Sequence, residues 1–331
     1  MPRSDELTLI ERFFRPLAGE GAFGLSDDAA RLVPKSGYDQ VITSDMIASG
    51  VHFLPDDPPD SIARKALRVN LSDLASKGAD PFGYSLNIAL GPEVNDGWIA
   101  SFAAGLSDDQ NRYGITMLGG DTISADTTLI SITVIGLVPG GKMVHRFTAQ
   151  PGDHLYVSGA IGAATAGLNL LTDPQSVFQQ LASETRDSCI SRYRVPVPRT
   201  ELVPAIRSFA RAAMDVSDGL IGDADKMAAA SGCTGKIIFE DIPLAAGLDD
   251  RAFQSAAESL ITGGDDYEIL AGIPPENAIA FERAAADVKI PVCRIGWLAE
   301  GHLPVQVMRD GREMVLGRRA YVHTSRMDRL P

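Results

Sequence analysis

The stretch Ala212-Ala213-Met214-Asp215-Val216-Ser217-Asp218-Gly219-Leu220 runs from one apolar segment through an acidic turn into another. Its pattern predicts a short strand over 212–216 and a helix over 219–231. A carboxylate at the end of an apolar strand is expected to face a cleft rather than a smooth surface. The stretch therefore predicts a fold of strands and helices in which acidic side chains gather at strand ends.

The same arrangement recurs along the chain. Strands predicted over 40–42 and 115–118 also run directly into polar, acidic segments. Predicted strands and helices mix in both halves, so the fold class that we expect is α/β (α+β), with two mixed α/β domains. The acidic positions in question are Asp27, Asp28, Asp45, Asp73, Asp121, Asp215, Asp218, Asp265 and Asp266.

The length of 331 residues favours two domains. Gln150-Pro151-Gly152-Asp153 combines residues that interrupt helices and strands, so we place the boundary there and predict domains 1–149 and 150–331. The stretch 170–199 has no clear period and carries no prediction.

Composition excludes several classes of protein. Asp and Glu number 43 against 30 Lys and Arg, and the net charge of −13 argues against binding to nucleic acid or to an anionic membrane. Three separated cysteines without a CxxC pair favour a reducing compartment, so we expect a cytoplasmic protein. No apolar run approaches the roughly 18 residues of a membrane span, and the first residues lack a secretory signal pattern.

The acidic positions predict a site for divalent cations. Carboxylates gathered in one cleft repel one another and raise one another's pKa unless cations separate them. A set of oxygen ligands with almost no His or Cys selects Mg²⁺ over Zn²⁺, and Thr43 and Ser44 beside Asp45 add further oxygens. The alternative for any single Asp is a helix cap or a solvated turn.

Bound Mg²⁺ usually also contacts substrate phosphates, which indicates nucleotide chemistry. The chain nevertheless lacks a GxxxxGK[ST] loop and a GxGxxG fingerprint, and its five histidines are scattered. Phosphoryl transfer needs positioning and charge neutralisation rather than a covalent group of the protein. An acceptor phosphate is already largely deprotonated at neutral pH, since its second pKa is about 6. The pattern is therefore compatible with a kinase that acts on a phosphate.

Several segments, taken in their order, resemble the thiamine-monophosphate kinase family, within the wider superfamily related to aminoimidazole ribonucleotide synthetase. The resemblance covers nearly the whole chain. Its segments are Ser26-Asp27-Asp28-Ala29-Ala30, Thr43-Ser44-Asp45-Met46, Gly50-Val51-His52-Phe53, Asn70-Leu71-Ser72-Asp73-Leu74, Gly78-Ala79-Asp80-Pro81, Gly119-Gly120-Asp121-Thr122, Asp215-Val216-Ser217-Asp218-Gly219-Leu220 and Gly263-Gly264-Asp265-Asp266-Tyr267-Glu268.

The resemblance implies transfer of the γ-phosphate of ATP to thiamine monophosphate, directly in line and without a phosphoenzyme, as the last step of thiamine diphosphate biosynthesis. It also implies a homodimer whose N-terminal domains, which bind ATP and Mg²⁺, pair their sheets into a barrel-like interface, while the C-terminal domain covers the active site. The implied Mg²⁺ ligands are Asp28, Thr43, Ser44, Asp45, Asp73, Asp121, Asp215 and Asp218. The implied contacts of ATP are Gly120, Asp121, Arg146 and Ser217, and those of thiamine monophosphate are His52, Asp265 and Tyr321.

Three positions depart from the family pattern. Ser26 stands where Gly is usual, Ser44 where Thr is usual, and Asp265 where Glu is usual. Other interpretations also stay open, because His52 can be a core histidine, Arg146 a surface ion pair and Tyr321 a packing residue of the C-terminal hairpin. The competing functions are a related ATP-dependent synthetase acting on a purine-pathway intermediate and a nucleotide sensor without catalysis.

Overall fold

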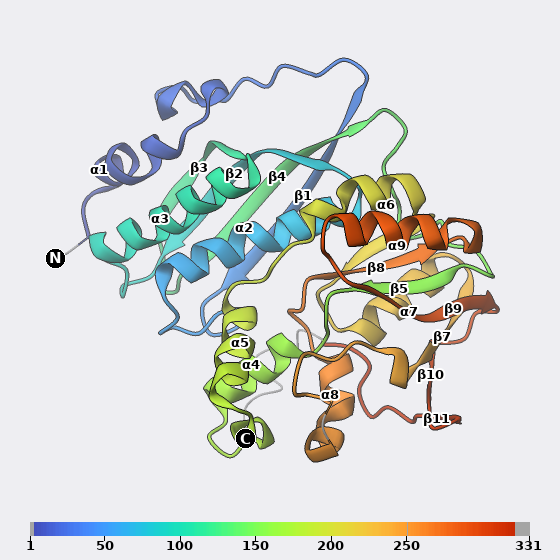
Figure 1. Ribbon diagram of the computed structural model, residues 1–331. Helices are drawn as coiled ribbons and strands as arrows, with labels where there is room; N and C mark the ends of the chain where they lie inside the picture. The colour runs from blue at the N-terminus through green and yellow to red at the C-terminus, as the bar shows by residue number, and fades with distance from the viewer. Residues whose placement is uncertain (1–2, 250, 322–331) are drawn as a thin grey trace. The chain divides into compact units, whose positions relative to one another are not determined.

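The computed structural model describes residues 3–249 and 251–321 and divides into two compact units (Figure 1). The first contains Met1–Met143 and Arg194–Val203, and the second contains Val144–Tyr193 and Pro204–Pro331. The chain enters the second unit before the Pro-Gly turn at 151–152, because His145 already pairs with Ala212 in a parallel bridge.

The first unit is built on a four-stranded sheet with the order β1-β4-β2-β3. β1 and β4 run antiparallel, as do β4 and β2, whereas β2 and β3 run parallel. The elements of this unit are α1 (Glu6–Leu9), η1 (Ile10–Phe14), η2 (Arg15–Leu17), η3 (Glu20–Leu25), β1 (Tyr38–Ala48), α2 (Pro59–Ser76), β2 (Asp80–Leu90), α3 (Asp96–Tyr113), β3 (Thr116–Ser124), β4 (Leu129–Pro139) and η5 (Thr200–Leu202).

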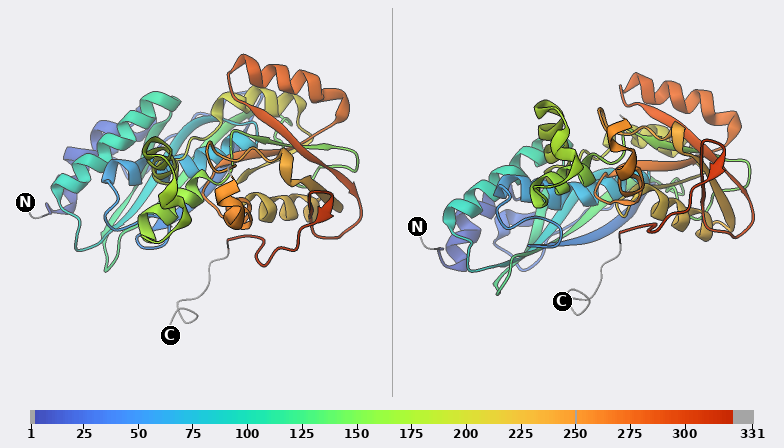
Figure 2. Two further views of the ribbon diagram at one scale, coloured as in Figure 1. Left: turned by 60° about the horizontal axis from the view of Figure 1, so that its bottom comes forward. Right: turned by 90° about the horizontal axis from the view of Figure 1, so that it is seen from below.

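Helices α2 and α3 cover one face of this sheet and leave the other face open (Figures 1 and 2). The burial pattern along the central strand β4 agrees with this arrangement. Ile130, Ile132 and Val134 are buried beneath the helices, while the residues that alternate with them are only half-buried. On the open face, Ile42 and Met46 of β1 are 62% and 58% exposed. The first unit therefore exposes large apolar side chains on its open sheet face.

Two strands of the first unit differ from the sequence prediction. β1 continues past the predicted 40–42, and β3 continues past 115–118, so Asp45 and Asp121 lie inside strands rather than at their ends. The prediction was wrong here because β1 and β3 are the two edge strands, where polar residues and the Gly119-Gly120 pair are compatible with pairing on one side. The sequence prediction also missed β2.

A buried ion pair joins α2 to α3. The Arg68 guanidinium donates two hydrogen bonds of 2.7 Å to the carboxylate of Asp109, and a third of 3.0 Å to the carbonyl of Pro196. Nearby, Arg194 pairs at 2.6 Å with the buried carboxylate of Asp57. These contacts explain why 194–203 belongs to the first unit, although it follows a segment of the second.

The second unit contains a seven-stranded sheet with the order β11-β10-β7-β9-β5-β8-β6. Helix α7 packs on β6 and β7 at one face, whereas α9 and α6 lie on the other (Figure 2). The predicted mixed α/β class with two domains each containing a sheet is thus confirmed. The elements of this unit are β5 (His154–Ser158), α4 (Ala163–Thr172), η4 (Val177–Gln180), α5 (Ser183–Arg194), α6 (Val203–Phe209), β6 (Ala212–Val216), α7 (Leu220–Ala230), β7 (Cys233–Ile238), η6 (Phe239–Asp241), η7 (Arg251–Ala256), α8 (Ala257–Thr262), β8 (Glu268–Ile273), η8 (Pro275–Asn277), α9 (Ala278–Asp287), β9 (Val292–Glu300), β10 (Gln306–Arg309) and β11 (Arg312–Glu313).

Among the helices of the described residues, none combines the length and the apolar character that crossing a bilayer requires.

The pairing of Arg68 with Asp109 can be tested against a neighbouring pair. Asp109→Asn is expected to lower the free energy of unfolding by about 3–5 kcal/mol, because Arg68 stays buried without its full counter-charge. Asp108 pairs with Arg64 at the same distance of 2.7 Å but is 66% exposed, so Asp108→Asn should cost about 1 kcal/mol or less. Urea unfolding of both variants measures the difference, and equal losses would contradict the assigned role of burial.

Candidate functional site

The first group of predicted ligands lies where β1 meets α2. The hydroxyl of Thr43 donates a 2.5 Å hydrogen bond to the carboxylate of Asp73 on α2, and the backbone N–H of Asp45 donates to the side-chain oxygen of Asn70 at 3.0 Å. Thr43 and Asp45 share a face of β1 with the buried Val41 and Ile47. Helix α2 thus holds Asp73 against β1, while Asp45 remains exposed.

The second group lies at β3. Asp28, Gly120 and Asp121 line one cavity of about 470 Å³, whose apolar wall includes Phe14 and Met117. Gly120 has φ +154°, and a Cβ there would lie 1.7 Å from the carbonyl oxygen of Leu86. Glycine is therefore required for β3 to approach β2 so closely.

The loop before Asp28 shows that the Ser26 departure carries no backbone cost. Ser26 has φ −105°, which any L-residue can adopt. The left-handed conformations lie just upstream, at Phe23, Gly24 and Leu25.

These two groups point to opposite faces of the sheet. Asp45 is in register with Ile132, which is buried under the helices, whereas Asp121 aligns through Asn87 with Ser131 on the open face. β1 and β3 are separated by three interstrand spacings, or roughly 14 Å at the usual distance between strands. Consistent with this separation, within 3–249 and 251–321 no three His, Cys, Asp or Glu side chains are arranged to hold a metal ion.

Ser44 points away from the α2 group. Its hydroxyl forms a 2.9 Å hydrogen bond with the hydroxyl of Thr133 on β4. Side chains alternate along a strand, so Ser44 faces the open side while Thr43 and Asp45 face α2. The oxygen-bearing side chains of Thr43, Ser44 and Asp45 are therefore divided between the two faces of the sheet.

In the second unit, Asp218 follows β6 in a loop that a buried carboxylate holds. One oxygen of Asp223 accepts the N–H groups of Ser217 and Asp218 at 3.0 and 2.9 Å, and its other oxygen accepts a 2.8 Å hydrogen bond from Lys226. Lys226 also pairs with the carboxylate of Asp218. Burial raises the pKa of Asp223, which Lys226 partly offsets. Asp215 lies just before this loop and is buried within β6.

Backbone strain marks the segment that contains Asp265. Asp265 and Tyr267 have φ of +71° and +51°, and their N–H groups donate to the carbonyls of Ser217 and Val216 at 2.9 and 2.8 Å. Left-handed conformations of residues other than Gly are costly and tend to occur at functional sites. Asp tolerates this conformation better than longer side chains do, which suits the Asp at position 265.

Between these two residues, Asp266 is directed into the interior. Its carboxylate accepts hydrogen bonds from the N–H of Gly162 at 2.9 Å and of Ala164 at 3.4 Å, at the start of α4. Desolvation raises the pKa of Asp266 from 3.8 to about 7, although the hydrogen bond from Gly162 opposes the rise. Through these hydrogen bonds, Asp266 connects the strained segment to the start of α4.

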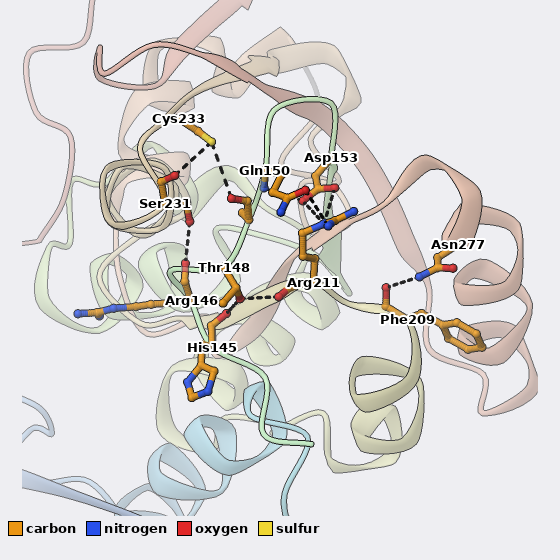
Figure 3. A network of polar contacts seen from close by, with 11 residues as sticks. His145, Arg146, Thr148, Gln150, Asp153, Phe209, Arg211, Ser231, Cys233 and Asn277 are labelled. Carbon is orange, nitrogen blue, oxygen red and sulfur yellow. Dashed lines mark hydrogen bonds and ion pairs between the residues drawn. The ribbon is translucent and has the colours of Figure 1, made fainter. Parts of the chain in front are cut away.

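Arg146 is held by its backbone and exposes its side chain. The carbonyl of Arg146 accepts a 3.3 Å hydrogen bond from Ser231, and the neighbouring His145 carbonyl accepts one from Thr148 at 3.1 Å. Figure 3 shows the guanidinium group of Arg146 extending away from this network. Among the described residues Arg146 forms no ion pair, and its side chain is exposed.

Hydrogen bonds to the backbone help to fix the positions of His52 and Tyr321. Nδ1 of the half-buried His52 accepts the N–H of Ala48 at 3.1 Å, so in the neutral ring the proton lies on Nε2. The N–H of Tyr321 donates to the carbonyl of Asp218 at 2.8 Å, which places Tyr321 beside the acidic loop.

Sequence reasoning missed Asp223 and Lys226, although an acidic residue in the first turn of a helix was a signal for the former. The sequence prediction included Asp266 but assigned it no role different from that of Asp265. Which of two adjacent carboxylates is buried depends on the backbone conformation, which the sequence does not show.

Comparison with known proteins now gives the class. Models of the AIR synthase related protein match residues 26–138 with its N-terminal domain and residues 150–307 with its C-terminal domain. A thiamine-monophosphate kinase from Caulobacter vibrioides is 42% identical over 329 residues, covering 96% of this chain and 90% of the relative. The chain belongs to the thiamine-monophosphate kinase family, which confirms the resemblance predicted from its motifs.

Solved structures agree with this membership. The thiamine-monophosphate kinase of Stenotrophomonas maltophilia K279a superposes with a TM-score of 0.82 at 34% identity, covering 93% of this chain and 98% of that one. A structure of AaThiL complexed with AMPPCP and TMP gives a TM-score of 0.75 at 27% identity, covering 96% and 97%.

The raised pKa of Asp266 predicts a dependence of stability on pH. In the folded state Asp266 keeps its proton above pH 3.8, where the unfolded chain releases it, so its contribution is full below 3.8 and is lost as pH rises through about 7. Asp266→Asn should remove this pH-dependent contribution. Between pH 3.8 and about 7, the difference in free energy of unfolding between the variant and the wild type should therefore change by about 1 kcal/mol per pH unit.

Urea unfolding of both proteins at a series of pH values measures the term. Asn keeps an acceptor for the N–H of Gly162, so a general loss of structure is not expected. Parallel stability curves would show that Asp266 does not titrate as described.

Proposed function

We propose that this protein transfers the γ-phosphate of ATP to thiamine monophosphate, giving thiamine diphosphate and ADP. The observation that carries the proposal is 42% identity to a thiamine-monophosphate kinase across nearly the whole chain, together with the presence of all the motif carboxylates. The name of the AaThiL complex, with an ATP analogue and TMP, supports the same pair of substrates. The purine-pathway alternative is not favoured by these relatives.

The mechanism needs no general base from the protein. The acceptor is a phosphate that is largely deprotonated at neutral pH, so its oxygen can attack directly in line. Arg146 is available to contact a phosphate of ATP, and Ser217, another proposed contact of ATP, follows Asp215 by two residues. His52, Asp265 and Tyr321 are the proposed contacts of thiamine monophosphate.

The oxygen donors fit Mg²⁺. The side chains of Asp28, Asp45 and Asp121 are exposed, and Mg²⁺ is usually held by only one or two carboxylates together with waters and phosphates. Such ions would neutralise the phosphate charges that otherwise keep the two substrates apart. The proposed ligands are those of the sequence prediction: Asp28, Thr43, Ser44, Asp45, Asp73, Asp121, Asp215 and Asp218.

We also propose a homodimer formed through the open sheet face of the first unit. Ile42 and Met46 on β1 and Ile123 on β3 are each more than half exposed on this face, and apolar patches of this kind mark interfaces. In a two-fold barrel, β1 of one copy can adjoin β3 of the other. This pairing would remove the three interstrand spacings that lie between Asp45 and Asp121 within one chain, by placing the strand of Asp45 next to the strand of the partner's Asp121.

A cytoplasmic location is part of the same proposal. The three cysteines are free, with Cys189 and Cys233 buried, as a reducing compartment favours.

The activity can be tested directly. Incubation with ATP, thiamine monophosphate and Mg²⁺ should yield thiamine diphosphate, and omission of Mg²⁺ should abolish it. Asp45→Asn and Asp121→Asn should each lower kcat/KM at least about 100-fold, as expected when a charge clamp on the transition state is lost. Turnover of a formylglycinamidine substrate instead would favour the synthetase alternative.

The shared site can be tested by mixing these two inactive variants. If Asp45 and Asp121 from different copies form one site, a mixed dimer contains one site with both carboxylates intact and regains part of its activity. If both ligands come from one chain, every site in the mixture carries a substitution. Activity of co-expressed, doubly tagged mixed dimers distinguishes the two arrangements, and unrecovered activity in an isolated mixed dimer excludes the shared site.

A further inference from the structure

The last described residues of the chain, 317–321, lie along helix α7 and are called here the C-terminal strap. Arg319 forms a two-pronged pair with Asp225 of α7, at 2.7 and 2.9 Å, and donates a further hydrogen bond of 2.7 Å to the carbonyl of Val305. Asp225 also accepts the N–H of Val305 at 2.7 Å. Hydrogen bonds to charged partners in this geometry are among the stronger ones, so the strap has a defined attachment point.

One position of α7 has no room for a side chain because the strap crosses it. A Cβ on Gly222 would lie 2.4 Å from Cβ of Ala320 and 3.2 Å from the carbonyl oxygen of Arg319. Glycine is less favourable than alanine inside a helix, so the helix by itself gains nothing from Gly222. Its effect is to let the strap approach the backbone of α7.

The strap ends at the acidic loop. The N–H of Tyr321 donates to the carbonyl of Asp218 at 2.8 Å, next to the amide groups that Asp223 holds from the other side. The ring of Tyr321 already faces a cation, since the guanidinium carbon of Arg318 lies 5.3 Å from its centroid. The strap therefore carries an aromatic ring that can contact a positively charged group, and its backbone is bonded to the Asp218 loop.

We propose that Gly222, Asp225 and Arg319 are positioning residues for thiamine monophosphate, because they seat the strap and thereby place Tyr321 beside the Asp218 loop. This inference rests on the proposed function and adds to it the residues that set affinity for the cationic, thiazolium-bearing substrate. ATP does not share that cationic group, so we expect the positioning residues to affect affinity for thiamine monophosphate more than affinity for ATP.

Gly222→Ala is the main test. It should raise KM for thiamine monophosphate about tenfold or more, as the loss of a well-placed cation–π contact allows, while KM for ATP and kcat change less than about threefold. Its thermal unfolding temperature should change little, because the gain from alanine in the helix offsets the loss of strap contacts. An unchanged KM for thiamine monophosphate, or an equal rise in both KM values, would overturn the proposal.

A second substitution provides the matched control. Ala320→Gly removes the atom that the new Cβ would meet at 2.4 Å, so Gly222→Ala/Ala320→Gly should recover most of the wild-type KM, and Ala320→Gly alone should resemble wild type. Asp225→Asn weakens the pair with Arg319 and should move KM in the same direction as Gly222→Ala. A double variant no better than Gly222→Ala would contradict the seating of the strap at Gly222.

Limited proteolysis separates this inference from the proposed function. Displacing the strap should speed tryptic cleavage after Arg318 and Arg319 in Gly222→Ala, as read from intact masses, whereas cleavage after the exposed Arg312 should stay unchanged. If the wild type fails to make thiamine diphosphate but this protease difference appears, the proposed function fails and the seating of the strap stands. If the enzyme is active but cleavage is unaltered, the inference fails alone.

Discussion

The alternation of side chains along β-strands is the constraint on which the acidic residues of the first unit depend. Once α2 and α3 cover one face of the four-stranded sheet, each residue of β1 and β3 is committed to the covered face or to the open one. Thr43 and Asp45 turn toward α2, whereas Ser44 and Asp121 turn toward the open face. Oxygen-bearing side chains that are adjacent in sequence are thus divided between the two faces of the sheet.

In the second unit, buried carboxylates position the polar loops by accepting hydrogen bonds from backbone N–H groups. Asp223 binds the amides of the Ser217–Asp218 loop, and Asp266 caps the start of α4 beneath the strained Asp265. Placing carboxylates in the interior is unfavourable unless hydrogen bonds compensate them, and here backbone N–H groups do so. Membership of the thiamine-monophosphate kinase family gives this arrangement a purpose, because a kinase that relies on positioning needs its contact residues held rigidly.

Sequence alone gave much of the fold. The strand over 212–216 has the predicted bounds, since it is short, apolar and buried on both faces. β1 and β3 were predicted too short because polar residues and paired glycines normally end strands, whereas an edge strand tolerates both. No pattern in the sequence separates Asp265 from Asp266, because their roles depend on a left-handed backbone that only the packing of 216–217 enforces.

The return of residues 194–203 to the first unit has a consequence for anyone who divides this chain. A fragment that ends near residue 143 would contain the whole four-stranded sheet, yet it would lack Arg194, the partner of the buried Asp57, and the Pro196 carbonyl that accepts from Arg68. The gene segment for residues 1–143 therefore does not encode a self-sufficient unit. A chimaera that joins such a segment to the rest of a related enzyme would combine Asp57 and Arg68 with partners from a different sequence.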